Sequence, residues 1–145
     1  MERAMLLPIV VGFDGSDGSE LALEWAVADA QRTGAPLELV FGVDIAVAAS
    51  SPFGTGMVFE QLEESGATVL AEAVEKVRAA GVEVTSHVEM ASPAQALINA
   101  SNRAAMVVVG RRGHGGFVGL LMGSVSSAVV HHAHCPVVVV PLEGR

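Results

Sequence analysis

Short apolar runs alternate along the chain with longer segments in which apolar positions recur every three or four residues. The short runs are rich in branched and aromatic residues, are bounded by glycine, proline or aspartate, and predict strands. The five predicted strands are Leu6–Phe13, Pro36–Val43, Val82–Glu89, Met106–Gly110 and Pro136–Val140. Successive apolar positions in the last two runs are typical of parallel strands that are covered on both faces. The pattern therefore predicts a buried parallel sheet.

Four helices are predicted between these strands, because capping and stop residues bracket the longer segments. In chain order, one begins at Ser16, Asp17 or Ser19 and ends at Gly34, one contains Leu70–Val77 and ends at Gly81, one opens at Ser92-Pro93, and one follows Gly123-Ser124 and stops before Pro136. Strand and helix alternate throughout, and right-handed crossovers then give a doubly wound α/β fold. We expect a single domain over residues 1–145.

The stretch Asp44–Phe59 has no clear period and contains several serines and glycines, so it is predicted to be a loop. A solvated connection is the favoured interpretation. A lid over a site is the alternative, because long loops in compact domains are often functional.

Composition limits the possible partners. The chain has 145 residues, 51% of them hydrophobic and 17% charged, which is enough for one sizeable core. The net charge is -8 and Lys76 is the one lysine, which argues against nucleic acid as a partner. Aromatic residues make up only 4%, which argues against a platform for stacking bases.

Cysteine usage and the apolar segments predict a cytoplasmic location. One cysteine, Cys135, cannot form an intramolecular disulfide, and the N-terminal residues do not resemble a secretory signal. The longest apolar runs are far shorter than the roughly 20 residues that span a bilayer. We therefore expect no membrane partner.

A glycine-rich segment, Gly110–Ser124, follows the fourth predicted strand and ends where a helix begins. Ligands of open α/β sheets bind beyond the carboxyl ends of the strands, and helix N-termini bind anions. The segment is therefore a candidate phosphate site. It is not a P-loop, because it has no lysine, so charge on terminal phosphates would come from Arg111, Arg112 or His114. A glycine loop with merely solvated arginines is the alternative.

The spacing Gly110-x2-Gly113-x9-Gly123-Ser124 resembles the G-x2-G-x9-G-[ST] signature of the universal stress protein family. The opening Ile9–Ser16 and the valine-rich flanks of the signature also match, so the resemblance covers essentially the whole chain. It implies a Rossmann-like fold of the adenine-nucleotide alpha-hydrolase type with strand order 3-2-1-4-5.

The resemblance also implies a set of residues for an adenine nucleotide. The carboxylate of Asp14 would contact the nucleotide, and Val43 would contact adenine through its backbone. The phosphates and ribose would be held by Gly110, Gly113, Gly123, Ser124 and Val125. Independently of the family, a carboxylate after the first strand suits ribose hydroxyls and repels phosphate. Asp14 could instead act only as a turn or capping residue.

Other sites have weaker support. Glycines 12, 15 and 18 do not have the spacing of a dinucleotide fingerprint. The histidines at 131, 132 and 134 lie beside Cys135, but histidines also favour a helix C-terminus, so no metal site is predicted. No motif for nucleophilic catalysis is present.

These features predict a stress-response protein that binds an adenine nucleotide, ATP first, and acts through nucleotide-dependent conformation or partner choice. Magnesium or manganese could bridge the phosphates. The alternatives are a slow ATP hydrolase, a cyclic AMP sensor and a dimerisation module without nucleotide. The apolar last strand is expected at a sheet edge, where it would pair with a second copy to form a homodimer.

Overall fold

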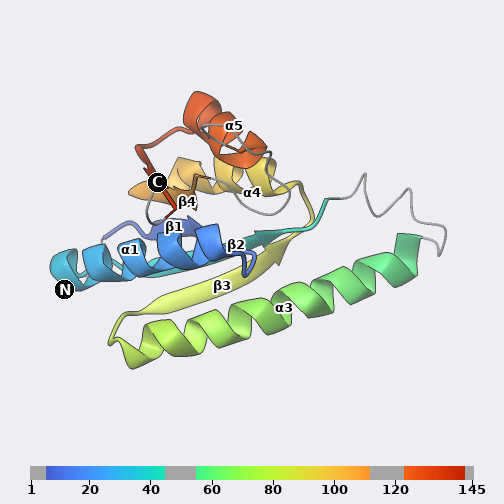
Figure 1. The fold of residues 1–145 in the computed structure, drawn as a ribbon, viewed down its shortest axis with the longest axis horizontal. Coiled ribbons are helices and arrows are strands. Elements are labelled where there is room, and N and C mark those ends of the chain that lie inside the picture. The colour runs from blue at the N-terminus through green and yellow to red at the C-terminus, as the bar shows by residue number, and fades with distance from the viewer. Residues whose placement is uncertain (1–5, 45–54, 112–122, 143–145) are drawn as a thin grey trace.

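The computed structural model describes residues 6–44, 55–111 and 123–142. Within them, five parallel strands form one sheet in the order β3-β2-β1-β4-β5. The strands are β1 (Ile9–Gly12), β2 (Leu37–Gly42), β3 (Val84–Glu89), β4 (Met106–Gly110) and β5 (Val137–Val140). The predicted strand order is confirmed. The strand order reverses between β1 and β4, which lie side by side in the sheet (Figure 1).

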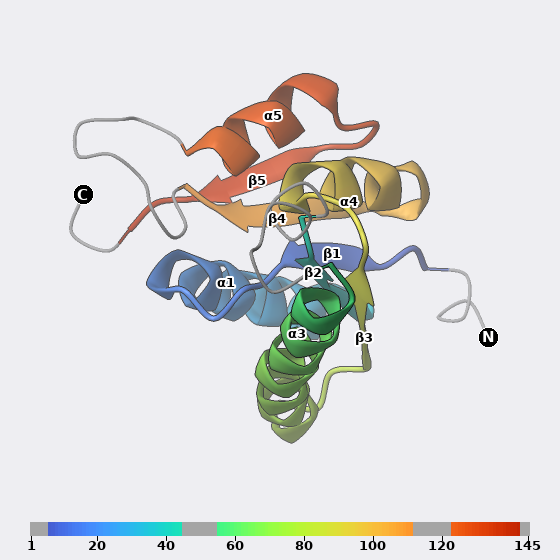
Figure 2. The same cartoon turned by 90° about the vertical axis from the view of Figure 1, so that its right-hand side faces the viewer.

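Four α-helices connect the strands in the described part of the chain: α1 (Asp17–Thr33), α3 (Thr55–Ala79), α4 (Pro93–Ala100) and α5 (Ser124–His132). A short 3-10 turn, η2 (Ser101–Arg103), follows α4. Helices α1 and α3 cover one face of the sheet, and α4 and α5 cover the other (Figure 2). None of the helices in these ranges is long and apolar enough to cross a membrane.

The valine-rich strands fill the core on both faces, as the pattern of successive apolar residues predicts. On the α1 and α3 side, Val11 and Val108 are 0% exposed, and on the α4 and α5 side so are Val10 and Val107. Alternate residues of one strand thus enter opposite cores, which is the arrangement that a doubly covered parallel strand requires.

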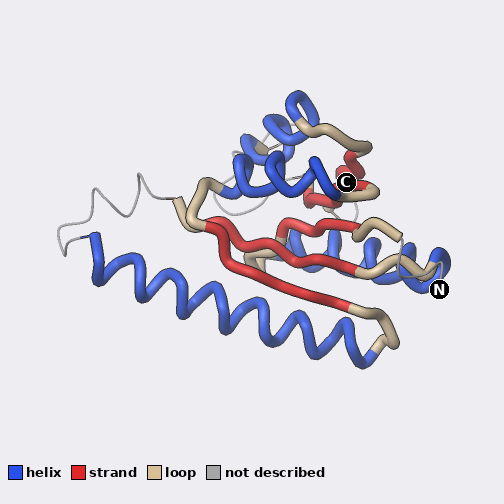
Figure 3. The backbone as a smooth tube through the Cα atoms, turned by 180° about the vertical axis from the view of Figure 1, so that it is seen from behind, coloured by secondary structure: helices blue, strands red, loops and turns tan. Residues whose placement is uncertain are grey.

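The start of α3 differs from the sequence prediction. Residues 55–59 were expected in a loop, but the helix already begins at Thr55. No proline occurs after Pro52 to interrupt the helix, and each residue added to an existing helix gains one backbone hydrogen bond. The rest of the predicted loop, residues 45–54, lies outside the described residues. As a result, α3 extends past the carboxyl ends of the strands (Figure 3).

One carboxylate is buried in the sheet, although its position between two leucines in β2 would predict an exposed side chain. Glu38 of β2 is 7% exposed, and its Oε2 accepts a hydrogen bond from Nη2 of Arg103 at 2.6 Å. Nε2 of His87 lies 3.4 Å from the same oxygen and 3.0 Å from Oε2 of Glu89. This group ties β2 and β3 to the turn after α4.

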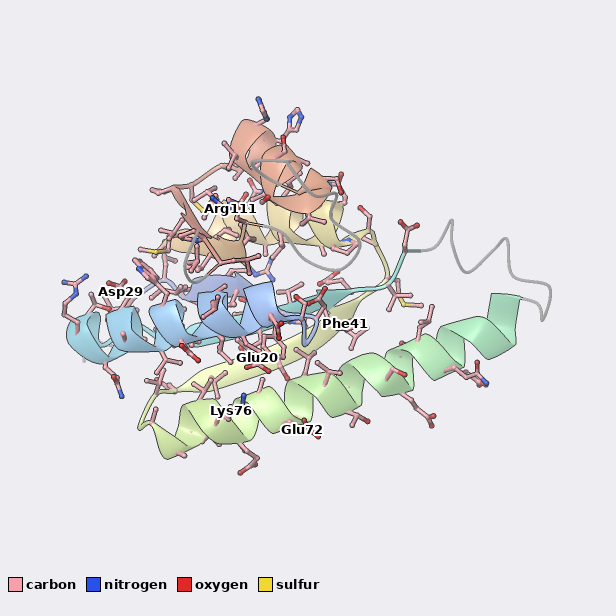
Figure 4. The ribbon with its side chains drawn as sticks, viewed as in Figure 1. Glu20, Asp29, Phe41, Glu72, Lys76 and Arg111 are labelled. Atoms are coloured by element: carbon pink, nitrogen blue, oxygen red, sulfur yellow. The ribbon has the colours of Figure 1, made fainter. Side chains whose placement is uncertain are left out.

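The one lysine of the chain has a structural contact. Nζ of Lys76 on α3 lies 2.8 Å from Oε1 of Glu20 on α1, and the two side chains point toward each other in Figure 4. Both are exposed enough for water to weaken the pair. Lys76 therefore links α3 to the first turn of α1 on one face of the sheet.

Candidate functional site

The candidate site lies at the carboxyl edge of the sheet, beyond the ends of β2, β1 and β4. Because β1 lies between β2 and β4, the residues that follow these three strands are neighbours in space. Val11 of β1 is opposite Val108 of β4, so Asp14 and Arg111 each lie three positions beyond paired residues on adjacent strands. The reversal of strand order at this point is the usual place for a ligand in open α/β sheets.

Asp14 occupies an exposed turn between β1 and α1. Its Oδ1 accepts a hydrogen bond from the backbone N–H of Ser16 at 2.9 Å, and its own N–H donates to Oγ of Ser19 at 3.4 Å. Gly15 makes the turn possible with a φ of +83°, a conformation that glycine adopts without strain. Asp14 thus has the turn role given above as an alternative, and its turn contacts hold the carboxylate at the edge of the sheet.

Val43 follows β2 directly and is 2% exposed. Its backbone N–H donates to the carbonyl oxygen of Glu89 at 2.8 Å, so this donor is already engaged within the fold. A base at this position would therefore have to meet the carbonyl of Val43, which can accept a hydrogen bond from an amino group.

Gly110 has a packing role that the sequence did not indicate. A β-carbon at this position would lie 2.6 Å from the carbonyl oxygen and 3.0 Å from the Cα of Gly18. Gly18 belongs to the first turn of α1, so two glycines allow this helix to touch the end of β4. The contact sets the distance between the start of α1 and the candidate site.

Hydrogen bonds to the backbone of Arg111 hold together the two ends of the segment that joins β4 to α5. Its carbonyl oxygen accepts hydrogen bonds from the N–H of Gly123 and from Oγ of Ser126, each at 2.7 Å. Its N–H donates to the carbonyl of Val140 at 2.8 Å. The chain thus leaves β4 and enters α5 at one point, whatever path the intervening residues take.

The side chain of Arg111 lies at this junction (Figure 4). Its Nε is buried and has no hydrogen-bond partner among the described residues. A buried donor without a partner costs about 1–3 kcal/mol, so a bound acceptor would regain that energy. A phosphate oxygen is such an acceptor.

Helix α5 begins without a side-chain cap. Its N-cap is Gly123, whereas α1 and α4 have the serine caps Ser16 and Ser92. The amides of Ser124 and Val125 therefore receive no side-chain acceptor from the cap position, and the helix dipole adds partial positive charge there. Together with Arg111, these amides make the start of α5 a favourable place for an anion.

Seven of the nine predicted residues lie among the described residues, at the carboxyl ends of β1, β2 and β4 or at the start of α5. They are Asp14, Val43, Gly110, Arg111, Gly123, Ser124 and Val125. Arg112 and Gly113 lie outside the described residues, as does His114. Two contributors were missed, Gly18 and Ser126. The sequence carried no local signal for either residue, because their contacts with Gly110 and Arg111 join segments far apart in the chain.

The histidines and the cysteine near the end of α5 are not assembled into a site. His131 places Nδ1 2.8 Å from the carbonyl of Ser127, one turn earlier. Burial raises the pKa of the Cys135 thiol, against a smaller opposite effect of its hydrogen bond with the backbone of Val107. The thiol thus stays protonated at neutral pH and packs against the core. In the described ranges, no three His, Cys, Asp or Glu residues are placed to hold a metal.

Comparison with known proteins shows the family of the chain. The model of the universal stress protein family matches residues 5–141. The chain belongs to the universal stress protein family. A curated universal stress protein of Mycolicibacterium smegmatis is 42% identical over 136 residues, which are 92% of this chain and 45% of that protein. This universal stress protein chain spans about half the length of the curated relatives that it matches.

Solved structures extend the comparison to the fold. A universal stress protein in complex with cAMP is 25% identical with a TM-score of 0.70, and the match covers 95% of this chain and 98% of that one. A universal stress protein from Archaeoglobus fulgidus in complex with dAMP is 24% identical with a TM-score of 0.67, covering 92% and 96%. This universal stress protein therefore has the family's Rossmann-like sheet.

Proposed function

We propose that this chain binds an adenine nucleotide, ATP first, at the carboxyl edge of the sheet, and acts through nucleotide-dependent conformation or partner interaction. The observation that carries the proposal is the buried Nε of Arg111, without a described partner, beside the uncapped start of α5. The cAMP complex of a relative adds support for the ligand class.

Each part of the nucleotide has a matching group at this edge. The amides of Ser124 and Val125 and the guanidinium of Arg111 suit phosphate oxygens, because they combine N–H donors with positive charge. The carboxylate of Asp14 suits ribose hydroxyls, which can donate to it. The carbonyl of Val43 suits the amino group of adenine, since the N–H of Val43 is engaged.

The charges of the site favour a triphosphate over a monophosphate. A single phosphate can be satisfied by the amides at the start of α5, whereas the guanidinium of Arg111 offers further donors for a second or third phosphate. Magnesium or manganese, when bound, would neutralise part of the phosphate charge, and Asp14 and Asp17 are the carboxylates near enough in the chain to contribute. No group is assigned to hydrolysis, and we expect slow or no turnover.

Calorimetric titration of the purified chain with ATP, ADP, AMP, cyclic AMP and GTP, each with and without magnesium, tests the proposal. We expect binding of the adenine nucleotides, with ATP the tightest and GTP much weaker. Absence of heat with every nucleotide would refute the proposal. Tight binding of cyclic AMP, without binding of the other nucleotides, would favour a cyclic AMP sensor instead.

We further propose a homodimer through β5, an outer strand of four partly buried valines. Light scattering is expected to give twice the 14.9 kDa mass of one chain. Val140→Lys should lower the mass to that of one chain. Val84→Lys is a matched control, because Val84 is also a partly buried valine on an outer strand and packs against the same core. A wild-type monomer at micromolar concentration would contradict this prediction.

A further inference from the structure

The sheet has a second outer strand, β3, whose free edge is unusually regular. It pairs with β2 through six consecutive residues, Val84–Glu89, without a bulge. Its sequence Val-Thr-Ser-His-Val-Glu contains neither proline nor lysine, two of the devices by which natural sheets protect an edge. Thr85 and Ser86 are exposed. In the described part of the chain, no strand occupies the outer side of β3.

A groove of about 400 Å³ lies between this strand and α3. Its apolar lining comes from Leu70, Val74 and the alanines at 67 and 71 on the helix and from Val88 on the strand. Its polar lining is Glu75 and Arg78 on the helix and Ser86 and His87 on the strand. The helix packs mainly on β3, the outermost strand, and runs beside it along its length (Figure 3). The groove therefore lies alongside the free edge, where the alternate side chains of an added strand could enter it.

Acidic side chains continue the line of the groove along α3. Glu60, Glu63 and Glu64 are exposed and precede Ala67 by one to two helical turns, on the part of α3 that extends past the strands (Figure 1). The whole chain carries a net charge of -8. Both the local and the total charge attract a basic partner and repel an acidic one.

We propose that the edge of β3 and this groove bind an extended, basic segment of another protein by strand addition. The segment has small apolar side chains at every second position, which enter the groove, and lysines or arginines at the end that lies beside Glu60, Glu63 and Glu64. Backbone hydrogen bonds to β3 supply affinity, while the groove and the acidic residues supply specificity. This surface is separate from the nucleotide site, and its function does not depend on nucleotide binding.

Selection of short random displayed peptides on the full chain tests the proposal. We expect enrichment of sequences in which apolar residues alternate with polar ones and end in lysine or arginine. Absence of enrichment, helical spacing of the apolar positions, or a preference for acidic peptides would overturn it.

Variants then locate the binding site of a selected peptide by fluorescence polarisation. Ala71→Arg fills the groove from an exposed position and should weaken binding at least about tenfold. Ala79→Arg is the matched control, an exposed alanine on the same helix outside the groove, and should bind as wild type. Glu60→Lys with Glu64→Lys should weaken binding about tenfold through charge alone. Equal binding by wild type and Ala71→Arg would place the peptide elsewhere and refute the proposal.

Strand addition itself is tested with backbone chemistry. N-methylation at alternate peptide positions on one side should abolish binding, whereas N-methylation on the other side should not, since only one side of a strand faces β3. Hydrogen exchange of outward amides in Val84–Glu89 should slow when peptide is bound. If Ala71→Arg instead lowers the mass of the protein alone, the occupant is a second copy of the chain and the proposal fails.

Discussion

Replacing Gly110 with alanine is expected to lower the free energy of unfolding by about 1–3 kcal/mol, because the new methyl group would overpack the contact with α1. The β-carbon would lie 2.6 Å from the carbonyl oxygen of Gly18, closer than real β-carbons approach other atoms. Backbone atoms in the first turn of a helix cannot turn away as a flexible side chain can. Relief would require α1 to move away from β4, which would open the core at Val11 and Val108.

Urea unfolding measures this loss, and Gly81→Ala is the matched control. Gly81 ends the turn before β3 with a φ of +80°, and no atom lies within 4 Å of its β-carbon position. Alanine there meets only backbone strain of about 1 kcal/mol. A smaller loss for Gly110→Ala than for Gly81→Ala would show that α1 tolerates displacement and that the glycine contact does not hold the site in place.

The role of Gly110 shows why the sequence could predict the fold more fully than the site. Valine runs, glycine stops and serine caps act through neighbouring residues, so the strands and the limits of α1 and α4 could be derived locally. The contact of Gly110 with Gly18 joins residues far apart in the chain, so the local spacing of apolar residues does not predict it. The glycine of the signature was therefore assigned to phosphate binding, with no indication that it also seats a helix.

Buried polar residues were harder to predict for the same reason. Glu38 lies between two leucines in β2, and alternation alone would expose it on one face. Its burial depends on Arg103, which reaches it from the turn after α4. The closure of the β4–α5 connection by Ser126 and Arg111 likewise appears only when strand order brings the two elements together. The burial and contacts of these residues depend on partners distant in the sequence, whereas the local pattern of apolar residues determines where helices and strands form.

Replacing Arg111 with alanine is expected to weaken ATP binding by about 10- to 100-fold, the loss that corresponds to a charged hydrogen bond of about 1.5–3 kcal/mol. Cyclic AMP, which has one phosphate, should lose less. The fold should persist, because Arg111 joins Val140, Gly123 and Ser126 through backbone atoms that alanine retains. Calorimetric titration of both nucleotides measures the ratio of the two losses.

A matched control distinguishes a direct contact of Arg111 with the phosphates from a general loss of positive charge. Arg32→Ala removes the same charge from an exposed position at the end of α1, paired there with Asp29. A loss caused only by the change in net charge would also appear in Arg32→Ala, whereas a direct contact weakens binding only in Arg111→Ala. Arg111→Lys should give an intermediate affinity, since an ammonium keeps the charge but not the planar fork of donors. Equal ATP affinities for wild type and Arg111→Ala would show that the guanidinium does not contact the phosphates. The reason to expect tighter binding of ATP than of a monophosphate would then be lost.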